Sequence, residues 1–232
     1  MMYDWQAGLA FFALVVALTK FGRYLAFKVP ALQQMRSINK EQDKIKRAQE
    51  KYPPVMKANA KVGLYANATF FIAVAPFCVT LQAQPLMKVL LDIIAILMVY
   101  DFFYYLTHRF LFHGQGYFRR VHALHHQARK PTHIDAYYVH PLETFVGILL
   151  FLLTIPLLAI FIGPFHSATV AITFVIWTQI NIINHCFVNL PYAPFKTLSW
   201  ITAKHAVHHE NMQMGNYATI TLLYDRMFGT LD

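Results

Sequence analysis

The sequence predicts an all-α integral membrane protein with about five transmembrane helices and a cytoplasmic, histidine-rich helical cap that holds a dimetal site. Apolar residues make up 57% of the 232 residues and charged residues only 13%, a balance far from that of soluble domains. Several apolar runs are long enough to cross a bilayer. Of the 12 histidines, all except His166 fall at the predicted inner ends of these runs.

The first predicted span covers about residues 5–27. It follows Tyr3, an aromatic residue typical of membrane interfaces, and it ends among Lys20, Arg23 and Lys28. A secretory signal carries positive charge before its apolar core, whereas this chain has Asp4 there. The pattern therefore predicts an uncleaved anchor whose N-terminus lies outside.

Residues 33–61 are polar and rich in Lys and Arg. The net charge of +9 could indicate a nucleic-acid partner, but a cytoplasmic loop that obeys the positive-inside rule explains it better, so we expect no nucleic acid. The outer half of this loop is expected to lie as a helix on anionic head groups, and Pro53-Pro54 to break it before the next span. We assign residues 1–61 to an anchor span with a basic loop, and residues 62–232 to a membrane catalytic domain.

The remaining spans are predicted at about residues 62–81, 86–106, 142–162 and 167–183. Short external turns at residues 82–85 and 163–166 connect them in pairs. Apart from Lys88, the basic residues fall on the inner side, which places the C-terminus inside. The protein is therefore expected in a bacterial inner membrane or an ER-type membrane, as a multi-pass protein with its histidines on the cytoplasmic face.

Two motifs place three imidazoles within five residues, namely His122-Ala-Leu-His-His126 and His205-Ala-Val-His-His209. On a helix, positions i, i+3 and i+4 lie on one face, so the three rings of each motif are predicted to converge on one spot. The alternative is a pair of solvated histidine-rich turns. Two such matches in one chain are unlikely to be accidental.

Other polar residues lie beside these motifs. His108 and His113 are five residues apart, about 140° on a regular α-helix, so either a π-bulge distorts the helix or the rings address different metals. Asp101 is either an acceptor for a ligand N–H or a helix-end carboxylate in a polar pocket. His185 is interpreted as a ligand rather than a packed polar residue, and His140 as a residue that supports the ligands or gates the site.

Eight or nine imidazoles with few carboxylates indicate a metal centre, because neutral imidazole binds iron, zinc and copper. That number is too large for one ion, so two metals are expected. The chain has no HExxH, phosphate-binding loop or GxSxG motif. The scarcity of carboxylates argues against a zinc-dependent hydrolase with a carboxylate base and against a transport path lined by Asp and Glu.

The order of these motifs resembles that of the fatty acid hydroxylase/sterol desaturase superfamily, the histidine-box membrane di-iron oxygenases. The resemblance covers roughly residues 92–232. It rests on HxxxxH, HxxHH and HxxHH, on a downstream Asn216-Tyr217, and on these further segments: His140-Pro-Leu-Glu143, Asn184-His185 and Tyr224-Asp-Arg-Met-Phe-Gly-Thr230.

The resemblance implies a non-haem oxygenase that uses O2 and two iron ions, with zinc as a possible substitute, to hydroxylate or desaturate a C–H bond of a lipid such as a fatty acyl chain or a sterol. The catalytic metal ligands carried over are His108, His113, His122, His125, His126, His185, His205, His208 and His209. Some members have a further histidine where this chain has Asn189, which leaves a tenth ligand or a water-filled position open.

Electrons in this family come from a fused cytochrome domain or a separate redox protein. The chain is too short for such a domain, so an external donor such as a ferredoxin or a cytochrome b5-like protein is expected. A basic cytoplasmic surface suits an acidic donor. The competing interpretation is a non-enzymatic membrane protein that binds or transports metal, although the confinement of the histidines to one face argues against a path through the membrane.

Overall fold

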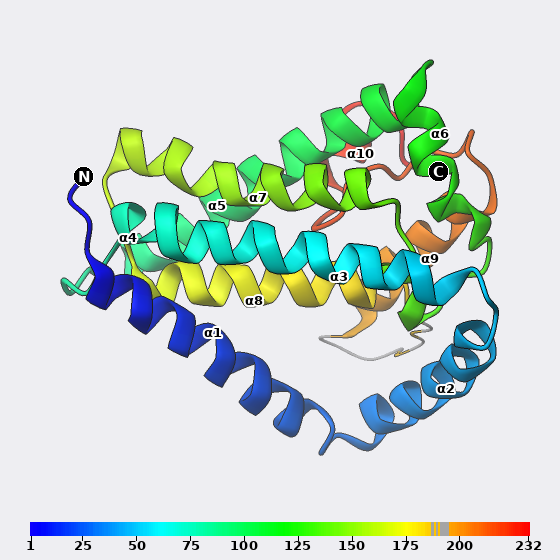
Figure 1. The fold of residues 1–232 in the computed structure, drawn as a ribbon, viewed down its shortest axis with the longest axis horizontal. Helices are drawn as coiled ribbons and strands as arrows, with labels where there is room; N and C mark the ends of the chain where they lie inside the picture. The colour runs from blue at the N-terminus through cyan, green and yellow to red at the C-terminus, as the bar shows by residue number, and fades with distance from the viewer. Residues whose placement is uncertain (187, 189, 191–194) are drawn as a thin grey trace.

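Helices account for most of the described chain in the computed structural model, which covers residues 1–186, 188, 190 and 195–232 (Figure 1). The α-helices are α1 (Trp5–Ala26), α2 (Pro30–Arg47), α3 (Tyr52–Thr69), α4 (Ala75–Cys78), α5 (Leu86–Leu106), α6 (Tyr117–Ala123), α7 (Pro141–Ile162), α8 (Ser167–Ile183), α9 (Phe195–Glu210) and α10 (Leu223–Met227). Shorter helical segments are η1 (Phe70–Val74), η2 (Thr107–Phe112), η3 (His125–Gln127) and η4 (His133–Tyr137).

The long apolar helices pack around an aromatic core. Helices α5 and α8 contact each other, α7 packs on α3 and α5, and α1 packs on α8. The Phe151 ring of α7 stacks on Trp177 of α8 with centroids 4.2 Å apart, and Tyr100 of α5 meets both rings edge-on. Phe11 of α1 is fully buried in the same cluster. These contacts hold the inner ends of α5 and α8 side by side.

Among the described residues, three helical segments are long and apolar enough to cross a membrane by length and composition, Trp5–Ala26, Tyr52–Cys78 and Pro141–Ile162. The segment Ser167–Ile183 is a shorter apolar helix. The other two predicted spans, residues 86–106 and 167–183, coincide with the helices α5 and α8, and the three long apolar segments are those expected of a membrane protein. Five crossings and the cytoplasmic orientation of the cap stay predictions.

The basic segment differs from the predicted loop, because most of it is helical. Helix α3 begins at Tyr52 rather than near residue 62, and Pro53 and Pro54 lie in its first turn. Proline is tolerated there, since the first N–H groups of a helix have no acceptor within the helix. The Asn59 amide then donates to the carbonyl oxygens of Tyr137 and Val139, which attaches the polar start of α3 to the segment before α7.

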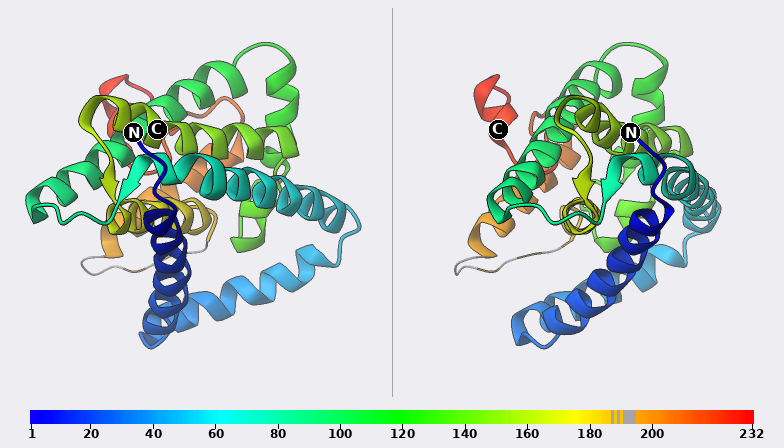
Figure 2. Two further views of the ribbon diagram at one scale, coloured as in Figure 1. Left: turned by 60° about the vertical axis from the view of Figure 1, so that its left-hand side comes forward. Right: turned by 90° about the vertical axis from the view of Figure 1, so that its left-hand side faces the viewer.

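Helix α2 covers the whole of residues 30–47 and is attached to η4. The Asp43 carboxylate accepts from the Ile134 N–H at 2.9 Å and contacts the His133 ring at 2.9 Å. Asp135 pairs with Lys46 of α2 and accepts from the Tyr52 hydroxyl at 2.7 Å. The C-terminal part of α1 and the helix α2 that follows it project away from the central helices, as both views of Figure 2 show.

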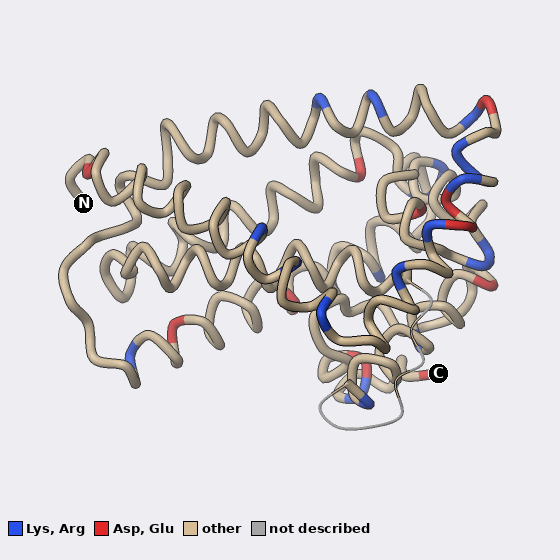
Figure 3. Tube along the Cα trace, turned by 90° about the horizontal axis from the view of Figure 1, so that it is seen from below, with Lys and Arg blue, Asp and Glu red and all other residues tan. Residues whose placement is uncertain are grey.

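The end that carries the N-terminus contains a strand pair that the sequence did not predict. The two-residue strands β1 (Val79–Thr80) and β2 (Phe165–His166) pair in parallel; β1 lies at the end of the span predicted over residues 62–81, and β2 lies in the turn predicted at residues 163–166. Gly8 of α1 packs so closely on Pro76 that an added Cβ would lie 2.8 Å from the proline ring. Lys and Arg gather towards the opposite end of the molecule (Figure 3).

Candidate metal centre

Nine histidines of the described chain, which are the nine candidate ligands, form two groups, and His108 and His185 among them lie just after the C-terminal ends of α5 and α8. Within each group, one nitrogen per ring lies within 4.8 Å of all the others. Group A contains His108, His113, His122, His126 and His208, and group B contains His125, His185, His205 and His209. All are buried except His113, which is partly exposed. Two adjacent groups fit the expected pair of metal ions.

Each HxxHH motif contributes to both groups, so the expectation that its three rings converge on one spot is wrong. His122 and His126 belong to group A, whereas His125, between them, belongs to group B. The second motif is divided in the opposite sense, with His208 in group A and its neighbours in group B. Positions i and i+4 are only about 40° apart on a helix, whereas i+3 points about 60° to the other side. Each motif therefore lies along the seam between the groups.

A π-helical segment brings His108 and His113 together. Residues 107–112 form this segment, and the His113 N–H donates to the His108 carbonyl oxygen at 2.9 Å, a bond across five residues. The wider turn places both rings in group A. Of the two alternatives that the spacing left open, the distorted helix is the one found.

Backbone carbonyl oxygens fix the ring orientation of three group A histidines. In each case Nδ1 lies at hydrogen-bond distance from a carbonyl oxygen, which can only accept, so Nδ1 carries the proton. The acceptors all lie in residues 212–217, after α9. The pairs are His108 with Tyr217 (2.7 Å), His113 with Met212 (2.9 Å) and His208 with Gly215 (2.7 Å).

A carboxylate orients the fourth ring of group A. The His122 Nδ1 lies 2.7 Å from Glu143 Oε1, and both side chains are buried. Helix α7 positions this carboxylate because His140 caps its start, accepting from the Leu142 N–H at 3.1 Å. Carboxylate partners of this kind fix the tautomer of a metal-binding histidine and raise its basicity.

Burial keeps these rings neutral. Loss of solvation lowers the pKa of His113 to about 4 and the pKa of His108, His122 and His208 well below the usual range. The same cause lowers the pKa of His185, His205 and His209. A neutral ring whose Nδ1 carries the proton presents a bare lone pair at Nε2, as metal coordination requires.

These lone pairs face each other. The Nε2 atoms of His108 and His122 are 3.0 Å apart, although each ring already donates its only proton through Nδ1. In group B, the Nε2 atoms of His125 and His185 are also 3.0 Å apart, while their Nδ1 atoms contact the carbonyl oxygens of Tyr138 and Asn181. Lone pairs at this distance repel each other unless a cation lies between them. The donor set therefore fits a metal ion in each group.

Three further residues were predicted to support the site, namely Asp101, His140 and Asn189. Among the described residues, neither Asp101 nor His140 forms a hydrogen bond with any of the nine rings. The Asp101 carboxylate accepts from the N–H groups of Thr219, Ile220 and Thr221, so the polar-pocket alternative describes it. His140 is a helix cap, and its predicted gating role stays a prediction. Asn189 lies outside the described residues.

Sequence reasoning missed Glu143 and the backbone of residues 212–217. Glu143 belongs to the segment His140-Pro-Leu-Glu143. A carboxylate three residues after His140, in the first turn of the next predicted helix, was the signal that could have identified it. The carbonyl acceptors have no such signal, because any residue type can supply a backbone oxygen.

Glu143→Gln should lower metal affinity at group A by about 10–100-fold, the usual cost of removing such a partner. Glutamine keeps the size of the side chain but loses the charge that holds the proton on His122 Nδ1. The measurement is a competition titration with a chelator on the purified protein. Glu210→Gln is the matched control, because Glu210 is exposed and follows the ligand candidate His209 directly. Equal affinity in both variants would contradict an orienting role for Glu143.

Comparison with known proteins finds a matching family model and related proteins for the part of the chain that contains these histidines. A family model described as fatty acid hydroxylase matches residues 93–230, which contain both histidine groups. A putative methylsterol monooxygenase of Dictyostelium discoideum is 31% identical over 141 residues, 58% of this chain and 48% of the relative. Methylsterol monooxygenase 1 of Rattus norvegicus is 32% identical over 136 residues, 56% of this chain and 43% of the relative.

A different activity occurs among the relatives as well. A very-long-chain aldehyde decarbonylase of Oryza sativa subsp. indica is 28% identical over 139 residues, 56% of this chain and 48% of the relative. The chain spans about half the length of these relatives. No solved structure gives a significant match.

Proposed function

Since the chain belongs to the fatty acid hydroxylase family, we propose that it is a membrane-bound non-haem di-iron oxygenase that hydroxylates or desaturates a C–H bond of a lipid. The observation that carries the proposal is the pair of buried histidine groups whose Nε2 lone pairs converge without protons between them. Both groups lie within the residues that match the family.

Iron is the proposed metal in both groups. Neutral imidazole suits iron and zinc alike, so the donor set alone does not choose between them. Two of the relatives carry the name methylsterol monooxygenase, which favours a redox metal. Bound iron would supply the activation of O2 and the oxidation of the C–H bond, and zinc would be an inactive substitute.

The side chains of this protein have defined roles in that proposal. The nine histidines bind the metals, and Glu143 with the carbonyls of residues 212–217 holds four rings at fixed angles. Burial of the rings keeps bulk water away from the reacting C–H bond. The placement of the lipid relative to the metals then decides between hydroxylation and desaturation.

The proposal places the metal centre on the cytoplasmic side of the membrane. The histidine-bearing ends of the helices lie at the end of the molecule where Lys and Arg gather, as the positive-inside rule requires. Insertion of one oxygen atom from O2 releases the other as water and consumes two electrons and two protons. We propose that an external donor, a ferredoxin or a cytochrome b5-like protein, supplies the electrons at this basic end.

Lipid mass spectrometry under ¹⁸O2 tests the reaction. Cells that make the wild-type protein are compared with cells that make His208→Ala, both supplied with iron and with a matched reductase and donor. The expected result is a lipid that gains one ¹⁸O atom, or loses two hydrogens, in the wild type alone. Iron bound to the purified protein without any change in lipids under these conditions would favour a metal-binding or transport protein instead.

A further inference from the structure

A cavity of about 720 Å³ lies between the joined helices α1 and α2, segment η4 and the inner half of α8. This volume is within the range of about 300–1,000 Å³ that is typical of small-molecule sites. Its walls are largely apolar and include Leu18, Ala26, Leu32, Met35, Val175 and Ile183. Helices α1 and α2 precede the residues that match the family, so this wall is a feature of this chain's own N-terminal segment.

The inner wall of the cavity adjoins group B. Ile182 and Cys186 line it, and both are close in sequence to His185, whose Nδ1 contacts the Asn181 carbonyl oxygen at 2.9 Å. Tyr137 also lines the cavity, and the next residue, Tyr138, provides the carbonyl oxygen that His125 Nδ1 contacts at 3.2 Å. The cavity wall is therefore built in part from sequence neighbours of the two group B histidines that the backbone orients.

The α1 and α2 walls of the cavity carry a cluster of basic residues. The lining includes Arg23 of α1 and four basic residues of α2, Arg36, Lys40, Lys44 and Arg47. None of these five forms an ion pair with a carboxylate in the described part of the chain. Asp43 is the carboxylate among the described lining residues, and it is already engaged by His133 and the Ile134 N–H.

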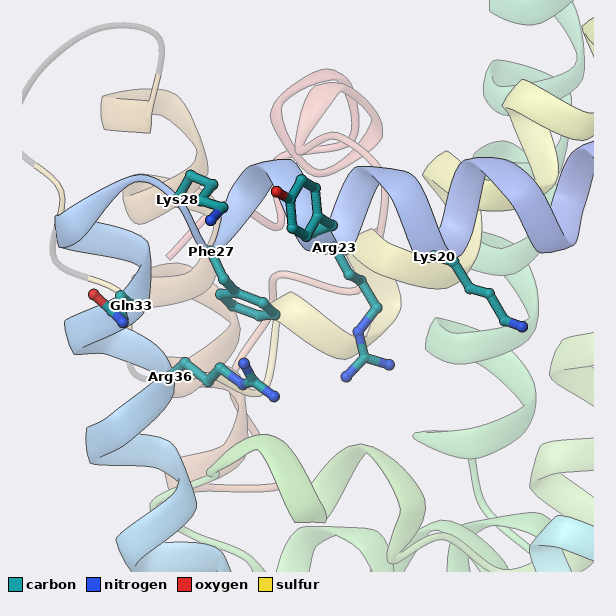
Figure 4. Close-up of a pocket in the computed structure, with 7 residues that line it drawn as sticks. Lys20, Arg23, Phe27, Lys28, Gln33 and Arg36 are labelled. Atoms are coloured by element: carbon teal, nitrogen blue, oxygen red, sulfur yellow. The ribbon is translucent and has the colours of Figure 1, made fainter.

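Two arginines face the same space at the junction of α1 and α2. Arg23 and Arg36 extend into this space from the two helices, with Phe27 next to both side chains (Figure 4). The Arg36 guanidinium lies over the Phe27 ring at 4.2 Å, which holds the arginine in place without neutralising it. The same three residues also line a second pocket of about 520 Å³, together with Lys20 and Lys28. The two pockets thus share a cationic wall.

We infer that this cavity binds the lipid substrate, and that the substrate carries an acidic head group, a carboxylate or a phosphate, which Arg23 and Arg36 bind. This inference rests on the proposed function. The planar guanidinium matches both acids through paired hydrogen bonds. A neutral sterol has a single hydroxyl and would leave the arginine pair without a counter-charge, so the substrate differs in head group from that of a methylsterol monooxygenase.

Binding of lipid probes to the metal-loaded protein in phosphatidylcholine nanodiscs tests the head group. The probes are palmitate, lysophosphatidate, hexadecanol and cholesterol, measured by scintillation proximity with radiolabelled ligand. Palmitate or lysophosphatidate should bind about tenfold more tightly than hexadecanol, as expected for a hydrogen-bonded charge. Equal binding of hexadecanol, or tighter binding of cholesterol, would overturn the inference.

Two pairs of variants locate the site. Arg23→Gln with Arg36→Gln should weaken binding of the acidic probes about tenfold and leave hexadecanol unchanged. The control removes two other exposed charges of the basic segment, Lys57→Gln with Lys61→Gln. Gly22 lines the cavity and an added Cβ there would meet nothing within 4 Å, so Gly22→Trp should weaken all chain-bearing probes, whereas Gly22→Ala should not. If the arginine double variant binds palmitate and lysophosphatidate as tightly as the wild type does, the assignment is refuted.

Further measurements distinguish a substrate site from a site for bulk membrane lipid, and the acidic-lipid site from the proposed oxygenase activity. Displacement of palmitate by phosphatidylglycerol in the nanodisc would mean that a bulk membrane lipid occupies the cavity, and would overturn the substrate assignment. Arginine-dependent binding without oxidation of any lipid would count against the proposed oxygenase and leave the acidic-lipid site standing. Oxidation of a neutral sterol at equal rates in the wild type and the arginine variant would support the proposed oxygenase and overturn the acidic-lipid site.

Discussion

His208→Ala should lose the metal of group A and all lipid oxidation while the protein stays in the membrane. The His208 ring is fully buried, its Nε2 lies 3.1 Å from that of His126, and its Nδ1 contacts the Gly215 carbonyl oxygen at 2.7 Å. Alanine removes this ligand but leaves the apolar spans untouched. We expect about one metal ion per chain instead of about two, because each histidine group fits one ion.

The neighbouring residue provides a matched comparison. His209→Ala should deplete the metal of group B instead, because adjacent residues of α9 serve different groups. His166→Asn changes a histidine outside both groups and keeps a residue that caps α8, so its metal content and activity should match the wild type. The measurements are metal content per purified chain by mass spectrometry and product per chain. Normal turnover of His208→Ala with reduced metal would contradict the two-metal oxygenase.

Asp101→Ala should destabilise the protein by several kcal/mol and weaken metal binding at group A. The carboxylate is fully buried and accepts the N–H groups of Thr219, Ile220 and Thr221 at 2.8–3.0 Å. Each buried donor left without an acceptor costs about 1–3 kcal/mol. Release of this segment would also displace the Tyr217 carbonyl oxygen, which orients His108.

Thermal unfolding and chelator competition in detergent check this effect. Asp92→Ala is the matched control, because Asp92 is another buried carboxylate of α5. It pairs with Lys88 at 2.6 Å near the N-terminal end of the helix, away from the histidine groups. That partly exposed pair should contribute at most about 1 kcal/mol, and its loss should leave the metals in place. Similar metal affinity in both variants would show that the segment after α9 does not depend on Asp101.

The sequence predicted the parts of this structure that follow regular periods. Apolar runs marked the long helices, and the two HxxHH motifs marked six of the histidines that form the two groups. The sequence could not predict that each motif is divided between two groups. The side chains at positions i+3 and i+4 point in directions about 100° apart, and the group that each ring joins depends on where the opposing helix lies. The spacing of five at His108 correctly left a π-helix open, since nothing local chose between the alternatives.

The rest depended on contacts between distant segments. Asp101 was assigned two equal interpretations because its partners lie more than a hundred residues later, in a loop without a periodic pattern. The polar residues 52–61 suggested a loop, but they are helical, and the Asn59 amide donates to the carbonyl oxygens of Tyr137 in η4 and Val139 after it. The cavity could not be predicted at all, because the sequence does not specify how far α2 stands from α8.

The orientation of His108 by the Tyr217 carbonyl oxygen has a consequence for the order of events during synthesis. The acceptor is made 109 residues after the histidine, an interval on the order of 5–20 s at ordinary translation rates. During that interval the early histidines emerge beside a membrane without their final geometry, and any divalent ion they meet can bind only loosely. In the proposed metal centre, selection among metals would therefore wait until the last segment docks, when the geometry of the folded site rather than the order of encounter decides which ion stays.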